Sequence, residues 1–145
     1  MATGSPSRSV WLGRSPLLLV IPPDWQVSPR SLGDLAGRPW VAGPPGTACD
    51  HALRRLTAEA GIAIPAGDVC VEFPSVLALV AAGRGAAIIP RLALGQSPVT
   101  ICALPPLGGR HIAALHQAGP AQPTPATAVL LDTLAQTCEA SRQTP

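Results

Sequence analysis

The stretch FPSVLALVAAGRGAAIIP at residues 73–90 limits the possible folds of this chain more than any other segment. Pro74 suits a first helical turn, where its missing N–H is no loss. Apolar residues then recur at helical spacing, at Val76, Leu77, Leu79 and Val80. Gly83 suits the end of this helix, and residues 86–89 form an apolar run so short that we expect a buried strand, stopped by Pro90. Such helix–strand units build layered domains, so an α/β fold is predicted.

Other strands and helices are expected to alternate around this unit. Strands are predicted at residues 16–21, 40–42, 68–72, 99–103 and 110–115. Helices are predicted at residues 31–36, at 47–60 after a Thr47 cap, and from about 125 onward. This alternation favours a mixed or parallel sheet covered by helices. Residues 1–15 are small and polar and are expected to form a flexible lead.

The composition is that of a globular domain. The chain has 145 residues, of which 47% are hydrophobic and 12% charged, so it can fill a core and is not disordered. Its net charge of +2, without a basic cluster, gives no indication of nucleic-acid binding. All ten basic residues are Arg, and Lys, Asn and Tyr are absent. This bias is typical of a bacterial gene rich in G and C.

Targeting and metal-binding patterns are not recognisable. Residues 1–15 lack the apolar core of a secretory signal, and the apolar run at 17–22 is too short to span a membrane. A cytoplasmic location without membrane association is therefore expected. The cysteines, which contain no CxxC pair, are expected to be free thiols that bind no metal: Cys49, Cys70, Cys102 and Cys138. No cofactor is indicated.

No set of residues argues for catalysis. Asp50 and His51 are adjacent on a predicted helix and so do not face each other. His111 and His116 are five residues apart on a predicted strand, and therefore lie on opposite faces. No catalytic residue is assigned, and an enzyme is the disfavoured class of function.

Two strand-to-helix turns are the candidate ligand-binding sites. In open α/β sheets, ligands bind at the carboxyl ends of strands, and helix N-termini favour anions. The first turn contains Pro45, Gly46 and Thr47, although an ordinary loop with a capping Thr is the alternative that the residues alone favour. The second contains Glu72, Phe73 and Pro74. Its alternative is a Phe73 packed in the core beside a solvated Glu72.

The chain resembles the effector-binding, or substrate-binding, domain of LysR-type transcriptional regulators. The resemblance covers roughly residues 10–140, and its segments come in the family's order. The most specific is LALVAAGRGAAIIPRLAL at 77–94. The others are PLLLVIPPDW at 16–25, SLGDLAGRPWV at 31–41, GTACDHALRRLTAEAG at 46–61, VTICALPPL at 99–107, RHIAAL at 110–115, and residues 125–139. The His-Pro that usually follows the first segment is replaced here by Asp24-Trp25.

The resemblance implies a type-2 periplasmic-binding-protein-like α/β fold, in which an effector binds between two subdomains. It predicts a domain at residues 16–140, followed by a tail at 141–145. Residues 22–98 correspond to one complete subdomain, the family's second. Residues 16–21 and 99–140 correspond to a remnant of the first. The winged helix-turn-helix, its linker helix and half of the first subdomain have no counterpart, so direct DNA binding by this chain is not expected.

The implied function is effector sensing for a LysR-type transcriptional regulator, with a small anionic or polar effector. The resemblance puts the turns at Pro45–Thr47 and Glu72–Pro74 on the second-subdomain wall of the effector cleft. Partners are then the effector and a homo- or hetero-oligomer with a LysR-type regulator. Two alternatives stay open. The chain is an interaction protein that pairs with an intact regulator and modulates it, or it is a non-functional gene fragment.

Overall fold

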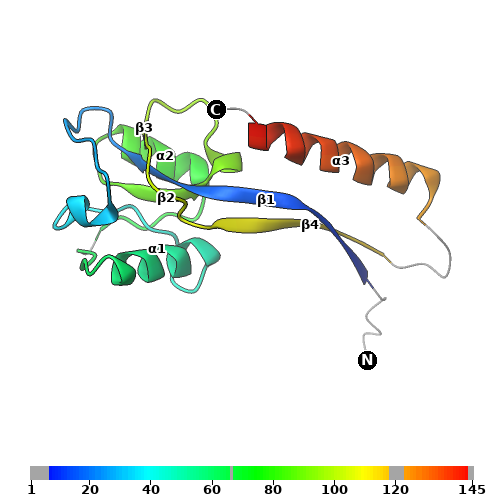
Figure 1. Cartoon of the computed structure of the whole chain (residues 1–145), viewed down its shortest axis with the longest axis horizontal. Helices are drawn as coiled ribbons and strands as arrows, with labels where there is room; N and C mark the ends of the chain where they lie inside the picture. The colour runs from blue at the N-terminus through cyan, green and yellow to red at the C-terminus, as the bar shows by residue number, and fades with distance from the viewer. Residues whose placement is uncertain (1–6, 66, 118–122, 144–145) are drawn as a thin grey trace. The chain divides into compact units, whose positions relative to one another are not determined.

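The computed structural model describes residues 7–65, 67–117 and 123–143 (Figure 1). The chain divides into two compact units, one made of residues 16–108 and one made of residues 1–15 and 109–145. The elements in chain order are β1 (Ser7–Ile21), a 3-10 helix (Leu32–Leu35), α1 (Ala48–Glu59), α2 (Phe73–Ala81), β2 (Ala87–Pro90), a second 3-10 helix (Arg91–Ala93), β3 (Thr100–Cys102), β4 (Gly109–Gln117) and α3 (Pro125–Gln143).

The unit of residues 16–108 is built on a mixed sheet. The last residues of β1 lie between β2 and β3 and are antiparallel to both, with Leu19 opposite Ile88 on one side and Cys102 on the other. Beyond β2, parallel bridges add two short extended segments, Trp40 beside Ala86 and then Ala42 beside Val69. The mixed sheet expected from the alternation of elements is therefore confirmed.

Helices α1 and α2 cover opposite faces of this sheet (Figure 1). Because successive strand residues point to opposite faces, β1 and β2 contribute to two cores. On the α1 side the core contains Leu19, Ile88, Trp40, Leu53 and Leu56. On the α2 side it contains Val20, Ile89, Val41, Val76 and Val80. All four residues of β2 are buried, as the uninterrupted apolar run predicts for a strand covered on both faces.

The predicted unit at 73–90 is present as α2, a turn and β2. Pro74 lies in the first turn of α2, and Gly83, just beyond the helix, has φ +81°, a left-handed conformation that suits glycine. Gly85 is required for a different reason. A Cβ at this position would lie 2.7 Å from the carbonyl oxygen of Pro39. Only glycine therefore lets β2 start alongside Pro39 and Trp40, where the Ala86 N–H donates to the Pro39 oxygen at 3.0 Å.

The other unit contains the first residues of β1, the strand β4, which pairs with β1, and the helix α3 (Figure 1). Residues 7–15 belong to β1, so the expectation of a flexible lead was wrong for them. Val10, Trp11 and Leu12 favour strands, but their hydrogen-bonding partner, β4, lies about a hundred residues away in sequence, where no local pattern points to it. Leu12 is buried, whereas Trp11 is 60% exposed.

The unit of residues 16–108 is wider than the segment 22–98 that the resemblance suggests. It includes the second half of β1 and all of β3, because these strands pair with each other within its sheet. Among the described residues, no helix has both the length and the apolar character needed to cross a membrane.

Candidate functional site

The two candidate turns lie at the same edge of the sheet in residues 16–108. Ala42 and Val69 form a parallel bridge, and the Cys70 N–H donates to the Ala42 oxygen at 2.9 Å. Each of these extended segments leads into a turn and then into a helix, α1 or α2. The carboxyl ends of neighbouring parallel segments thus bring Pro45–Thr47 and Glu72–Pro74 to one edge, from which the helices leave over opposite faces.

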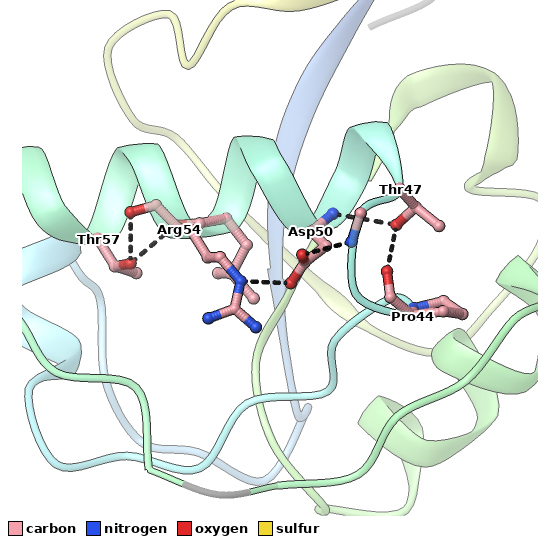
Figure 2. Close-up of polar contacts among 7 residues, drawn as sticks. Pro44, Thr47, Asp50, Arg54 and Thr57 are labelled. Atoms are coloured by element: carbon pink, nitrogen blue, oxygen red, sulfur yellow. Dashed lines mark hydrogen bonds and ion pairs between the residues drawn. The ribbon is translucent and has the colours of Figure 1, made fainter.

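The first turn is held by hydrogen bonds within itself (Figure 2). The Thr47 hydroxyl donates to the Pro44 carbonyl oxygen at 2.8 Å and accepts the Asp50 N–H at 3.3 Å, which caps α1 as predicted. Pro45, Gly46 and Thr47 are exposed. Gly46 has φ +84°, a conformation that glycine adopts without strain. The hydroxyl proton of Thr47 is therefore engaged inside the turn, and the residue fixes the shape of the turn.

Asp50 is the residue that ties this turn to the body of α1. Its side chain is buried, with one carboxylate oxygen accepting the Gly46 N–H at 3.0 Å and the other accepting the Arg54 Nε–H at 2.8 Å (Figure 2). The hydrogen bond from Arg54, followed by that from Gly46, lowers the pKa of Asp50 below its ordinary value. An ionised carboxylate therefore already lies at the N-terminus of α1, with a guanidinium beside it.

The second turn is less constrained by side chains. Glu72 is the N-cap residue of α2, but its exposed side chain makes no capping hydrogen bond. Phe73 is half-buried and packs against the core on the α2 side. Pro74 is exposed in the first turn of the helix. Phe73 thus contributes to the core, as the alternative interpretation of this turn expects, while Glu72 and Pro74 face solvent.

Sequence reasoning did not identify Asp50 and Arg54 as structural partners. It considered Asp50 only with its neighbour His51, although the spacing from Asp50 to Arg54 is the i, i+4 spacing at which helix side chains meet. The three-residue spacing from Thr47 to Asp50 is that of a capping box, in which the carboxylate here reaches the Gly46 N–H instead of that of Thr47. Both signals are local and could have been found.

A cavity of about 310 Å³ is lined by residues of α1 and by residues that follow this helix in the chain. Its lining includes Trp40, Asp50, Leu53, Arg54, Ile64 and Val69. In the part of the chain that the structure describes, Trp40 Nε1 is the one buried side-chain nitrogen or oxygen with no hydrogen-bond partner. Leaving such a donor buried and unpaired costs about 1–3 kcal/mol. No sequence pattern pointed to this cavity.

Other polar groups of residues 16–108 have structural roles. Arg84 Nε lies 2.9 Å from an Asp68 carboxylate oxygen, which links the turn after α2 to the edge of the sheet. This hydrogen bond lowers the pKa of Asp68 and raises that of Arg84. Burial raises the pKa of the Cys102 thiol, which makes it less reactive. The four cysteines, all among the described residues, are in no disulfide and are partly buried.

Comparison with known proteins identifies the family. Residues 5–139 match the LysR substrate binding domain family. A comparison with curated protein sequences gives no significant match.

Solved structures with a similar fold are consistent with this family assignment. The effector-binding domain of QuiR in complex with shikimate has a TM-score of 0.69 at 17% identity, over 97% of this chain and 69% of that one. The regulatory domain of Synechocystis PCC6803 CcmR in complex with 2-PG has a TM-score of 0.67 at 17% identity, over 100% and 72%. HinK, a LysR family transcriptional regulator from Pseudomonas aeruginosa, has a TM-score of 0.69 at 15% identity, over 91% and 48%.

The chain thus spans about seven tenths of the isolated effector-binding and regulatory domains and about half of HinK. The resemblance noted from the sequence and the fold expected from it are both confirmed. The chain belongs to the LysR substrate-binding-domain family, a family of effector-binding domains of transcriptional regulators and not of enzymes, and it has their type-2 periplasmic-binding-like α/β fold.

Proposed function

We propose that this chain is an effector-sensing module that binds a small anionic or polar molecule at the turns Pro45–Thr47 and Glu72–Pro74. One observation carries the proposal. The parallel bridge between Ala42 and Val69 makes both turns follow neighbouring strand ends at one edge of the sheet. This is where ligands bind in open α/β sheets, and the helices α1 and α2 both begin there.

The two turns differ in how well they suit an anion. At the first turn, the charge of the Asp50 carboxylate is offset by Arg54 at 2.8 Å, so the partial positive charge at the start of α1 is not opposed by an unpaired acid. At the second turn, Glu72 is exposed and its side chain makes no capping hydrogen bond, so it repels an anion unless it turns away. The first turn is therefore the primary contact.

The ligands bound to two solved structures of similar fold support a ligand of this class. One is bound to shikimate, a small carboxylate, and the other to 2-PG. In this proposal residues 16–108 contribute one wall of an effector cleft. A single wall gives weak binding, with a dissociation constant on the order of 1 mM, which corresponds to about 4 kcal/mol.

A titration of the ¹⁵N-labelled chain with shikimate, and separately with acetate, tests the proposal. The amide signals of Gly46, Thr47 and Phe73 are expected to move most, because these N–H groups belong to the two turns. Thr47→Val should reduce the shifts, since it removes both hydrogen bonds that shape the first turn. Thr47→Ser, which keeps the hydroxyl, is the matched control. Shifts that cluster elsewhere, or that Thr47→Val leaves unchanged, contradict the assignment.

A second candidate function rests on apolar side chains outside residues 16–108. Among the described residues of that part, large hydrophobic side chains are exposed at Trp11, Leu115, Val129, Leu130 and Leu134. Exposed apolar surface of this kind is typical of interaction sites. We propose as the alternative that the chain pairs with a LysR-type regulator, without contacting DNA itself. When the chain is co-expressed with a tagged LysR-type regulator from the same organism, the two should then co-purify. Leu130→Ser should weaken this complex. Thr133→Ser, on the same exposed helix, should leave it unchanged.

A further inference from the structure

The cavity lined in part by α1 offers hydrogen-bond donors that the proposed effector turns do not use. Its lining includes Leu53 and Arg54 of α1 and the apolar side chains of Ile64 and Val69. Its volume of about 310 Å³ is at the lower end of the range for small-molecule sites. Every residue that lines it belongs to the unit 16–108.

Arg54 supplies the first set of donors. Its Nε–H is held by Asp50 at 2.8 Å, which fixes the orientation of the guanidinium (Figure 2). Among the described residues, Asp50 is the only hydrogen-bond partner of this guanidinium. The two terminal nitrogens are therefore open on a group that is already oriented. The planar guanidinium presents its N–H groups as a fork, which matches the two oxygens of a carboxylate.

Trp40 supplies the second donor. The residue is 1% exposed, and its Nε1 has no acceptor among the described residues. Buried tryptophan N–H groups usually have a partner. Trp40 is one of the residues that line the cavity, so a ligand bound there lies beside this residue. The acidic groups nearby do not supply an acceptor, since Asp50 is engaged by Gly46 and Arg54, and Asp68 by Arg84.

We propose that this cavity is a second ligand site, separate from the effector turns, which takes a small carboxylate with an apolar body. The carboxylate pairs with the terminal nitrogens of Arg54, and the apolar body packs against Leu53, Ile64 and Val69. An oxygen of the ligand accepts the Trp40 N–H. A cation is disfavoured here, because both acidic residues of the lining are already paired with arginines.

The test uses cyclohexanecarboxylate as the probe and the indole N–H signal of Trp40 as the readout. The indole signal is assigned with Trp40→Phe. On titration, this signal and the amides of Leu53 and Val69 should shift with one common dissociation constant. The uncharged analogue cyclohexanecarboxamide, which has the same ring, should bind at least about tenfold more weakly, because it cannot make a charged pair with Arg54.

Two neighbouring arginines of α1 provide a matched pair of variants. Arg54→Gln should weaken binding by about tenfold or more. Arg55→Gln should not, because Arg55 pairs with Glu59 and does not line the cavity. If Arg54→Gln fails to fold, Arg54→Lys keeps the charge but loses the fork, and should weaken binding severalfold.

Three results would overturn the proposal. The first is an indole signal that stays in place at saturating probe, with a cross-peak to water only, which would mean that the cavity holds solvent. The second is equal weakening by Arg54→Gln and Arg55→Gln. The third is binding of the amide as tight as that of the acid. A titration that moves Gly46 and Phe73 but not the Trp40 indole would contradict this site while leaving the proposed effector turns standing.

Discussion

At the scale of single residues, Gly85 is a position where adding one methyl group should destabilise the fold. Its φ is not in the left-handed region, so the requirement for glycine is purely one of space. The Cβ of an alanine would lie 2.7 Å from the Pro39 oxygen and 2.9 Å from the Trp40 nitrogen, and both are backbone atoms that cannot turn aside. Gly85→Ala should therefore lower the free energy of unfolding by about 1–3 kcal/mol, measured by urea denaturation.

Gly33→Ala is the control for this substitution. Gly33 also has no left-handed φ, and the nearest atom to an added Cβ is the Ser31 hydroxyl oxygen at 3.4 Å, which belongs to a side chain. Its effect should stay within about 0.5 kcal/mol. Equal effects of the two substitutions would mean that the close approach at Gly85 does not limit the fold.

At the scale of one element, α1 contains two acid–arginine pairs at the same spacing but in different surroundings. The Asp50 carboxylate is buried and accepts two hydrogen bonds, whereas Arg55 and Glu59 are both exposed. Since folding lowers the pKa of Asp50, its ionised form stabilises the fold above about pH 4, the ordinary value of an unfolded Asp. That contribution disappears as the pH falls through the lower pKa of the folded state.

Asp50→Asn should therefore have a lower urea midpoint than the unchanged chain at pH 7, and the difference should narrow at about pH 2.5. Glu59→Gln should change the free energy of unfolding by less than about 0.5 kcal/mol at both values, as is usual for exposed pairs. The prediction fails if both variants behave alike at pH 7, or if the Asp50→Asn difference stays constant with pH.

The elements that the sequence predicted best are those with local signals. The helix from Phe73 and the strand that ends at Pro90 follow from apolar spacing with proline and glycine at the ends, and the Thr47 cap follows from one residue type at one position. What could not be predicted depends on contacts between distant segments. Residues 7–15 become a strand through β4, and the cavity arises where Trp40 and Ile64 meet α1. Neither of these contacts produces a periodic pattern of residues in the sequence.

At the scale of the whole molecule, the two compact units differ in how much core they contain. Among the described residues, almost all buried hydrophobic side chains belong to residues 16–108, and Leu12 is the exception. Hydrogen-exchange protection follows buried apolar contacts. The amides of β2 and of Val76–Val80 in α2 should therefore exchange more slowly than those of β4 and α3. Mass spectrometry of peptides from each segment would check this, and equal protection in both units would refute it.

The position of β1 in the sheet has a consequence for the way the protein is made. β1 is the first of the described strands to leave the ribosome, but its partners in residues 16–108 come much later, with Leu17 opposite Pro90 and Ile21 opposite Thr100. At roughly 5–20 residues per second, translation leaves the run Leu17–Ile21 unpaired for several seconds. Pairings this distant in sequence also close slowly. The apolar run Leu17–Ile21 therefore stays exposed to solvent until β2 and β3 have been synthesised. We expect a chaperone to bind this segment during synthesis.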